Sequence, residues 1–203
     1  MIAIIDYGMG NLRSVLKKFE NLKIDAQITG DLKEIEKADK LILPGVGHFA
    51  NGVKKLKEKG IWEVLNEKVL VKQTPILGIC LGMQLMAGFS EEGNCEGLNW
   101  IDSKVVKFRI NNSLQYKVPH MGWNQLTVER ECLLSKMISE SDTFYFVHSF
   151  HIICNNKEDI IFSTDYEYKF TSAINKGNIW GVQFHPEKSH IAGEQMLNNF
   201  FML

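Results

Sequence analysis

The chain has 203 residues, enough for one domain with a substantial hydrophobic core that needs no metal or disulfide staple. A formal net charge of −1 gives no electrostatic reason to expect nucleic acid or an anionic membrane as a partner. Its four cysteines are irregularly spaced and include no Cys-x-x-Cys pair, which indicates neither a zinc site nor a disulfide framework. We therefore expect a reduced, cytoplasmic protein without a metal or cofactor.

The first half of the chain alternates apolar strand-like runs with helical patterns. Strands are expected at 2–5, 24–29, 40–43 and in the apolar run before Cys80, and helices at 12–19, 31–38, 49–59 and 61–72. The run at 2–5 has no basic flank, so it is predicted to be a first strand and not a signal peptide. No apolar run approaches the roughly 20 residues of a membrane span. This alternation favours an α/β fold with a mixed, mostly parallel central sheet of flavodoxin-like type, flanked by helices.

The second half is dominated by strand signals. After a polar, glycine-containing loop at 90–99, strands are expected at 104–110, 125–129, 143–148, 152–154, 160–163, 170–175 and 179–184. An amphipathic helix at 191–202 closes the chain. Neither a repeat nor a linker divides the sequence, so residues 1–203 are expected to form one domain.

Two glycine-containing turns follow predicted strands. Gly8 and Gly10 lack the third glycine of a dinucleotide fingerprint, because position 13 is Arg13, so nucleotide binding is not expected there. Gly45 and Gly47 lie in a tight loop at the carboxyl end of the third strand, where open α/β sheets bind ligands. Their exposed amides could receive an oxyanion, or the loop could be a plain turn, and the local sequence leaves both open.

Cys80 lies at the centre of the strongest motif. Gly78, Cys80 and Gly82 have the spacing of a nucleophile elbow, with a thiol in place of the hydroxyl. We expect strained backbone at the cysteine and a helix from Leu81 to about Phe89 whose N-terminus points at the sulfur. A free thiol is only about 3% ionised at pH 7, and full ionisation costs roughly 2 kcal/mol. Since a helix N-terminus contributes only about 0.5–1 kcal/mol, a nucleophilic Cys80 requires a nearby imidazolium. The alternative is a buried core cysteine.

His185 and Glu187 supply a partner pair for the thiol. They are two residues apart after the strand at 179–184, and Pro186 keeps the segment out of a helix, so both side chains can lie on one side of the backbone. The carboxylate would accept one imidazole N–H and leave the other nitrogen for the thiol. This predicts a catalytic triad of Cys80, His185 and Glu187, against the alternative of a structural histidine.

Several stretches together resemble a known family. They are residues 4–14, 43–47, 77–84, 118–124, 144–149 and 183–189, of which 118–124 read Val-Pro-His-Met-Gly-Trp-Asn. On these stretches the chain resembles class I, triad-type glutamine amidotransferase domains. Over nearly its whole length it is similar to the HisH family, the glutaminase subunits of imidazole glycerol phosphate synthase.

The resemblance implies hydrolysis of the glutamine side-chain amide to glutamate and ammonia. It implies an oxyanion hole formed by the amide of Leu81 and one from Gly45, Val46 or Gly47, and a substrate pocket that includes Gln84, His148 and Ser149. It further implies a (β/α)8-barrel cyclase partner, HisF, which uses the ammonia in histidine biosynthesis. Five residues correspond to family positions at or near that interface: Asn11, His120, Met121, Trp123 and Lys188.

Two alternatives remain open on the sequence. Phe150 stands where the family usually has tyrosine, and residues 90–100, 150–154 and 187–190 look closer to a branch that supplies ammonia to a sugar-modifying amidotransferase of surface glycans. A protein of another class, a DJ-1-like cysteine hydrolase or redox sensor on a similar fold or a catalytically silent binding subunit, is the second alternative. His-Pro-Glu together with Gln84 argues against that class, because a sensor needs no amide pocket.

Overall fold

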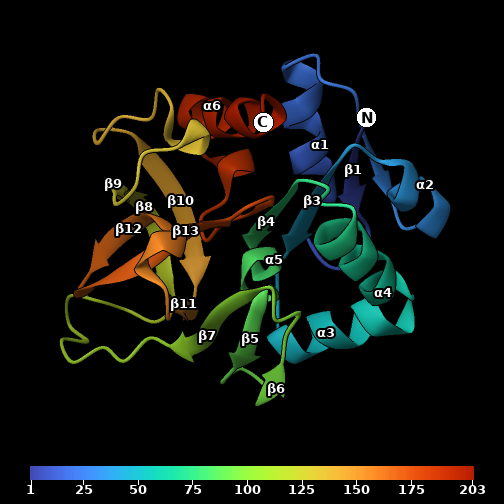
Figure 1. Ribbon diagram of the computed structural model, residues 1–203. Coiled ribbons are helices and arrows are strands. Elements are labelled where there is room, and N and C mark those ends of the chain that lie inside the picture. Colours follow the sequence, from blue (N-terminus) through green and yellow to red (C-terminus); the bar gives the residue numbers. More distant parts are fainter.

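Five parallel strands form the half of the sheet that carries Cys80. In spatial order they are β2 (Ala26–Thr29), β1 (Ile2–Ile5), β3 (Lys40–Gly45), β4 (Ile76–Cys80) and β14 (Ile179–Val182). The computed structural model describes residues 1–203 (Figure 1). All four residues of β1 are buried, as expected for a strand covered by helices on both sides.

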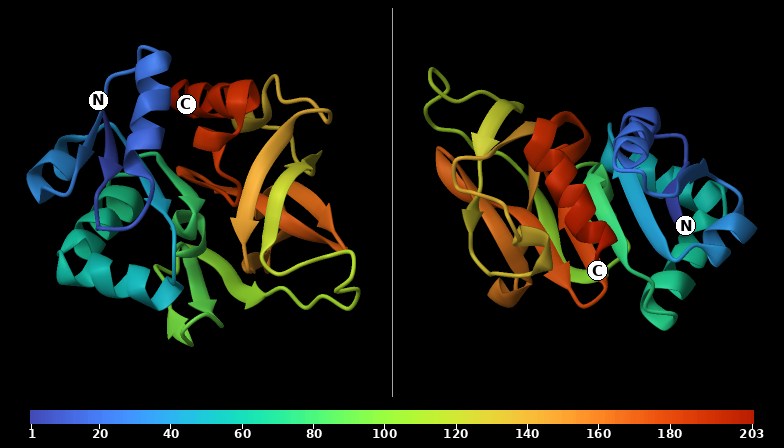
Figure 2. Two further views of the ribbon diagram at one scale, coloured as in Figure 1. Left: turned by 180° about the vertical axis from the view of Figure 1, so that it is seen from behind. Right: turned by 90° about the horizontal axis from the view of Figure 1, so that it is seen from above.

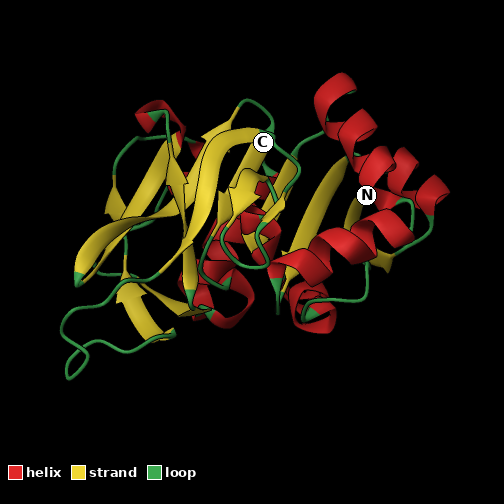
Figure 3. Cartoon of the chain, turned by 90° about the horizontal axis from the view of Figure 1, so that it is seen from below, coloured by secondary structure: helices red, strands yellow, loops and turns green.

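The sheet continues beyond β14 with mostly antiparallel strands. In spatial order these are β13 (Tyr168–Lys176), β11 (Phe150–Cys154), β7 (Ile101–Lys107), β5 (Ala87–Ser90) and β6 (Cys95–Glu96), of which β7 and β5 pair in parallel. β12 (Ile160–Tyr166) pairs with β13 and with the short β9 (Thr127–Val128). Figure 3 shows most of the helices gathered around the parallel half.

Alternate side chains of the central strands feed two separate cores. Ala3 and Ile5 pack on the face covered by α2 (Leu32–Lys37), α3 (Phe49–Glu58) and α4 (Ile61–Asn66). Ile2 and Ile4 pack on the opposite face, which is covered by α1 (Leu12–Asn21) and α6 (His190–Phe201). The expected α/β fold with a mixed, mostly parallel sheet is confirmed.

A separate two-stranded ribbon lies beside the main sheet. β8 (His120–Gln125) pairs antiparallel with β10 (Thr143–His148), and in this register His120 lies opposite His148. The loop before β8, residues 108–119, projects from the body of the molecule (Figure 2). No helix is long and apolar enough to cross a membrane.

The sequence prediction was wrong in several segments, including the loop expected at 90–99, which contains β6, and residues 120–124, which form most of β8 and were not expected to be a strand. The helix expected from Leu81 to Phe89 ends at Gln84, and β5 follows it at Ala87. The helix expected at 61–72 is α helical only to Asn66 and continues as a π-helix, Glu67–Val71. The strand expected at 125–129 is divided between the last residue of β8 and β9.

Candidate functional site

Cys80 is the last residue of β4 and the residue before the one-turn helix α5 (Leu81–Gln84). Its φ of 54° is positive, a conformation that costs roughly 1–3 kcal/mol in a non-glycine residue. The two flanking glycines are required by packing, since a Cβ on Gly82 would lie 1.7 Å from the carbonyl oxygen of Leu43, and one on Gly78 would lie 2.6 Å from the amide of Met83. The strand therefore turns into the helix as a strained elbow, with the thiol at its apex.

The helix behind the elbow is shorter than expected. A single turn of four residues aligns few peptide dipoles, so its N-terminus contributes little to stabilising a thiolate. A reactive thiolate at Cys80 would therefore depend on neighbouring side chains from other segments of the chain.

His185 and Glu187 follow β14, the parallel neighbour of β4, and this pairing brings their segment to the end of the sheet where Cys80 lies. Nδ1 of His185 lies 2.8 Å from Oε1 of Glu187, and both side chains are 2% exposed. Two further contacts hold the segment: the His185 amide donates to the Tyr145 carbonyl at 2.8 Å, and the Ser189 hydroxyl donates to the His185 carbonyl at 2.6 Å. Nε2 of His185 is buried and has no hydrogen-bond partner, so it remains available for proton exchange.

The charges around His185 favour its protonated form. Burial acts to lower the pKa of its imidazole, but the Cys80 thiolate and then the Glu187 carboxylate outweigh burial and raise the pKa to about 10. The carboxylate bound to Nδ1 also fixes the ring orientation. This arrangement can hold a thiolate and an imidazolium side by side.

Gln183 is a second neighbour of the thiol. The sequence predicts no role for this glutamine. It is fully buried, and its Nε2 donates to Sγ of Cys80 at 3.6 Å. Its Oε1 accepts from Nε2 of Gln84 at 2.9 Å. Gln183 lies in one of the family-like stretches, two residues before His185, and that position was the only signal for it.

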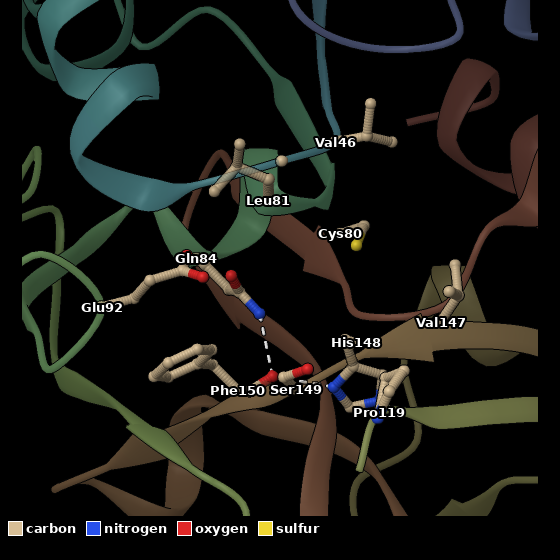
Figure 4. A pocket seen from close by; sticks show the side chains of 11 residues that line it. Val46, Cys80, Leu81, Gln84, Glu92, Pro119, Val147, His148, Ser149 and Phe150 are labelled. Atoms are coloured by element: carbon tan, nitrogen blue, oxygen red, sulfur yellow. Dashed lines mark hydrogen bonds between the residues drawn. The ribbon is translucent and has the colours of Figure 1, made fainter.

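A cavity of about 390 Å³ opens beside the thiol (Figure 4). Seven residues that the sequence singled out line it: Val46, Gly47, Cys80, Leu81, Gln84, His148 and Ser149. Gly45, the other residue expected at the oxyanion hole, lies opposite Cys80 in the β3–β4 register. Four further lining residues had been assigned no part in the pocket: Glu92, Pro119, Val147 and Phe150.

Glu92 is the only acidic residue of the cavity lining. Its carboxylate accepts from the amide of Phe49 at the start of α3, at 2.7 Å, which fixes its position. Glu92 lies in the segment 90–99, where the sequence predicts a polar loop, and no local pattern distinguishes it there. It gives the cavity an acceptor for a cationic group.

The residues expected at a partner interface lie in different environments. Met121 and Trp123 are 62% and 46% exposed on β8, whereas His120 on the same strand is 3% exposed and points inward. Lys188 is exposed, with Nζ 5.2 Å from the centre of the Tyr145 ring. Asn11 is exposed at the beginning of α1, a helix that contacts the turn carrying Lys188.

No three histidine, cysteine, aspartate or glutamate side chains lie together as potential metal ligands. The other three cysteines are partly buried and unpaired, and burial raises the pKa of the Cys95 and Cys154 thiols.

The fold and this cysteine site define a class of protein. A family model described as glutamine amidotransferase class-I matches residues 3–203. Two solved structures share the fold: PurLQS from Thermotoga maritima has a TM-score of 0.71 at 15% identity, covering 99% of this chain and 97% of that chain. The glutaminase domain of Trypanosoma brucei CTPS has a TM-score of 0.64 at 20% identity, covering 98% of this chain and 91% of that domain.

Curated relatives narrow the class. Imidazole glycerol phosphate synthase subunit HisH 2 of Methanococcus maripaludis is 52% identical over 200 residues, 98% of each chain. Subunit HisH 1 of Campylobacter jejuni is 48% identical over 204 residues, and subunit HisH 2 of Pseudomonas aeruginosa is 44% identical over 203 residues, both covering 100% of each chain. The chain therefore belongs to the class I glutamine amidotransferases, in the family of HisH subunits, which confirms the resemblance seen in the sequence.

Proposed function

We propose that the chain is the glutaminase subunit of an imidazole glycerol phosphate synthase, and that Cys80, His185 and Glu187 hydrolyse glutamine to glutamate and ammonia. One observation carries the proposal. A strained cysteine beside a buried imidazole–carboxylate pair borders a cavity with a single acidic side chain. This combination suits an amide substrate that also bears an ammonium group.

In the proposed reaction, Sγ of Cys80 attacks the amide carbon of glutamine and forms a tetrahedral oxyanion. The amide of Leu81 and one from Gly45, Val46 or Gly47 would donate to that oxyanion, and one well-placed donor is typically worth about 2.7–4 kcal/mol. The His185 imidazolium gives its proton to the departing nitrogen, which leaves as ammonia. Water, deprotonated by the now neutral imidazole, then hydrolyses the thioester and releases glutamate.

The substrate would be held by the polar groups of the cavity. The Glu92 carboxylate suits the α-ammonium of glutamine, and the Gln84 side chain, one turn along α5 from Cys80, suits the side-chain amide. His148 and Ser149 border the same space at the end of β10.

Free ammonia becomes ammonium in water, so the reaction serves synthesis only when the chain is docked to an enzyme that consumes ammonia. We propose a (β/α)8-barrel cyclase, HisF, as this partner, bound through the surface that carries Asn11, His120, Met121, Trp123 and Lys188. His120 would contribute from behind that surface, because its side chain is buried. We propose histidine biosynthesis as the pathway, in line with the synthase named in the relatives, and the cytoplasm as the location.

The central test is glutamate release by the purified chain, alone and with a barrel cyclase. We expect strong stimulation by the cyclase. Cys80→Ala should reduce glutamate release at least about 1,000-fold while ammonia-driven synthesis by the complex continues, because only the nucleophile is removed. Loss of both activities would mean that Cys80 has a structural role. No release in any complex would favour a DJ-1-like or binding protein.

The ammonia acceptor is tested separately by growth of a histidine auxotroph that lacks its own glutaminase subunit. Growth supports the histidine pathway. A chain that releases glutamate with a barrel partner but fails to restore growth would instead supply a sugar-modifying amidotransferase, the reading suggested by Phe150 and its flanking residues.

A further inference from the structure

A continuous series of hydrogen bonds, here called the hydrogen-bond chain, runs from β8 to the cavity beside Cys80. Nδ2 of Asn124 lies 3.4 Å from Nε2 of His120, and Nδ1 of His120 lies 3.1 Å from Nε2 of His148. Nδ1 of His148 lies 2.7 Å from the carbonyl oxygen of Phe150. Nε2 of Gln84 donates to the same oxygen at 3.0 Å. Figure 4 shows Gln84 and His148 converging on this carbonyl from opposite sides.

The direction of every bond in this chain follows from its two ends. A carbonyl oxygen only accepts, so Nδ1 of His148 carries a hydrogen and its Nε2 must accept from His120. At the other end, Nδ2 of Asn124 also donates to the carbonyl of Asp165 at 3.0 Å, which fixes the Asn124 amide orientation. Nε2 of His120 therefore accepts as well. Both histidines are neutral, with the hydrogen on Nδ1.

Their surroundings match this neutral state. His120 and His148 are 3% and 6% exposed, and the His120 ring stacks between Phe146 and Tyr166, at centroid distances of 4.8 Å and 4.0 Å. Burial lowers the pKa of His120 to about 4 and that of His148 well below its ordinary value. Neither ring can therefore supply a second hydrogen at near-neutral pH, and the direction of the chain is fixed.

The hydrogen-bond chain determines which atom of the Gln84 amide faces the cavity. Its Nε2 uses both hydrogens, one on Phe150 and one on Oε1 of Gln183, so its own Oε1 remains as an acceptor in the cavity lining. The Phe150 carbonyl and Oε1 of Gln183 together set this orientation, and His148, bonded in turn to His120, holds the carbonyl. His120 is thus connected to the substrate-facing atom of Gln84 without lining the cavity itself.

We propose that His120 is a positioning residue for glutamine: it holds His148 in one tautomer, and through the Phe150 carbonyl it fixes the Gln84 acceptor. The inference rests on the proposed glutaminase function. It assigns to His120 a role in substrate affinity that is separate from contact with a partner.

The test compares three variants in the complex with saturating barrel cyclase. His120→Phe keeps an aromatic ring between Phe146 and Tyr166 but removes the donor to His148, so we expect the KM for glutamine to rise at least about tenfold while kcat changes less than about threefold. His120→Asn places an amide N–H near the Nδ1 position and should bring KM back to within about threefold of the native value.

His151→Phe is the matched control. Like His120, His151 is buried and packs against Phe108. Its ring nitrogens contact the Ile152 carbonyl and the Tyr168 hydroxyl and take no part in the hydrogen-bond chain. We expect its KM to stay within twofold of the native value. A KM for His120→Phe within twofold of native, or an equal rise in His151→Phe, would overturn the proposal.

Nitrogen-15 NMR of the isolated chain gives a second measurement that does not depend on activity. We expect directly bonded hydrogens on Nδ1 of His120 and of His148. In His120→Phe, the Nε2 signal of His148 should shift because its donor is lost. A hydrogen on Nε2 of His148 in the native chain contradicts the inference. Absence of glutamate release by the native complex would instead count against the glutaminase function, and the NMR result would still decide the hydrogen-bond chain.

Discussion

His185 is enclosed by two groups that both stabilise its charged form, the Cys80 thiolate and the Glu187 carboxylate. Because its pKa in the folded chain lies near 10, above the ordinary value of 6.5, the folded state holds this proton more tightly than the unfolded state does. Taken alone, this contribution to stability is fully present below about pH 6.5 and is lost as the pH rises through about 10. The contributions of His120 and His148 to stability have the opposite pH dependence and are lost as the pH falls, because burial lowers the pKa of both.

Glu187→Gln tests this electrostatic arrangement. We expect the pKa of His185 to fall from about 10 toward its ordinary value, since the amide cannot balance the imidazolium charge. The variant should lose about 1.5–3 kcal/mol of unfolding free energy at pH 7, and the difference from the native chain should shrink between pH 7 and 10. NMR titration of the imidazole and urea unfolding at several pH values measure both. A His185 pKa that stays near 10 in the variant would mean that Cys80 alone sets it.

At the scale of elements, the nucleophile elbow could be predicted because its chemistry is local. Three residues at fixed spacing, Gly78, Cys80 and Gly82, require a turn that tolerates no Cβ on either side. The point where the following helix ends could not be predicted, because the apolar residues of 85–89 suit a helix or a strand equally. Tertiary pairing decided it: the carbonyls of Leu85, Ala87 and Gly88 accept from the amides of Leu98, Asn99 and Gly97, and β5 pairs with β7.

Gly82→Ala is expected to disrupt the elbow. Its Cβ would lie 1.7 Å from the carbonyl oxygen of Leu43, so α5 must move away from β3, at a cost of about 3 kcal/mol or more. Thermal unfolding and glutamate release should both decline. Gly52→Ala is the control, because in α3 its Cβ meets only the flexible ends of two side chains, Leu85 at 3.2 Å and Leu81 at 3.5 Å. We expect it to stay within about 1 kcal/mol of native. If Gly52→Ala lost as much stability and activity as Gly82→Ala, the elbow would be no more sensitive to an added Cβ than the helix α3.

At the scale of the whole molecule, the sheet order accounts for how distant residues meet. β14 pairs with β4 in parallel, so Gln183 reaches a cysteine 103 positions earlier. The triad could be proposed from motifs, and it stays a prediction until activity is measured. The contacts of Gln183 and the inward direction of His120 could not be foreseen, because both depend on strand register across long separations.

The surface of the β8–β10 ribbon is where we expect a partner to dock. Trp123→Ala should weaken binding to the barrel cyclase at least about tenfold in calorimetric titration, because exposed aromatic side chains commonly anchor interfaces. The melting temperature of the isolated chain should change by less than about 2 °C, since the ring is half exposed. Val71→Ala, at a position 67% exposed on the π-helix, is the control and should leave binding unchanged. Unchanged binding by Trp123→Ala would place the interface elsewhere.

β8 has one further consequence for how this sequence can vary. Successive side chains of a strand point to opposite sides, and in β8 one side carries Met121 and Trp123 while the other carries His120 and Asn124. An insertion or deletion of one residue between His120 and Trp123 would place both side chains on the same side of the strand, so that either the indole becomes buried or the imidazole becomes exposed. A single substitution in this segment changes one side chain, whereas a change in its length moves a whole set of side chains to the wrong side of the strand.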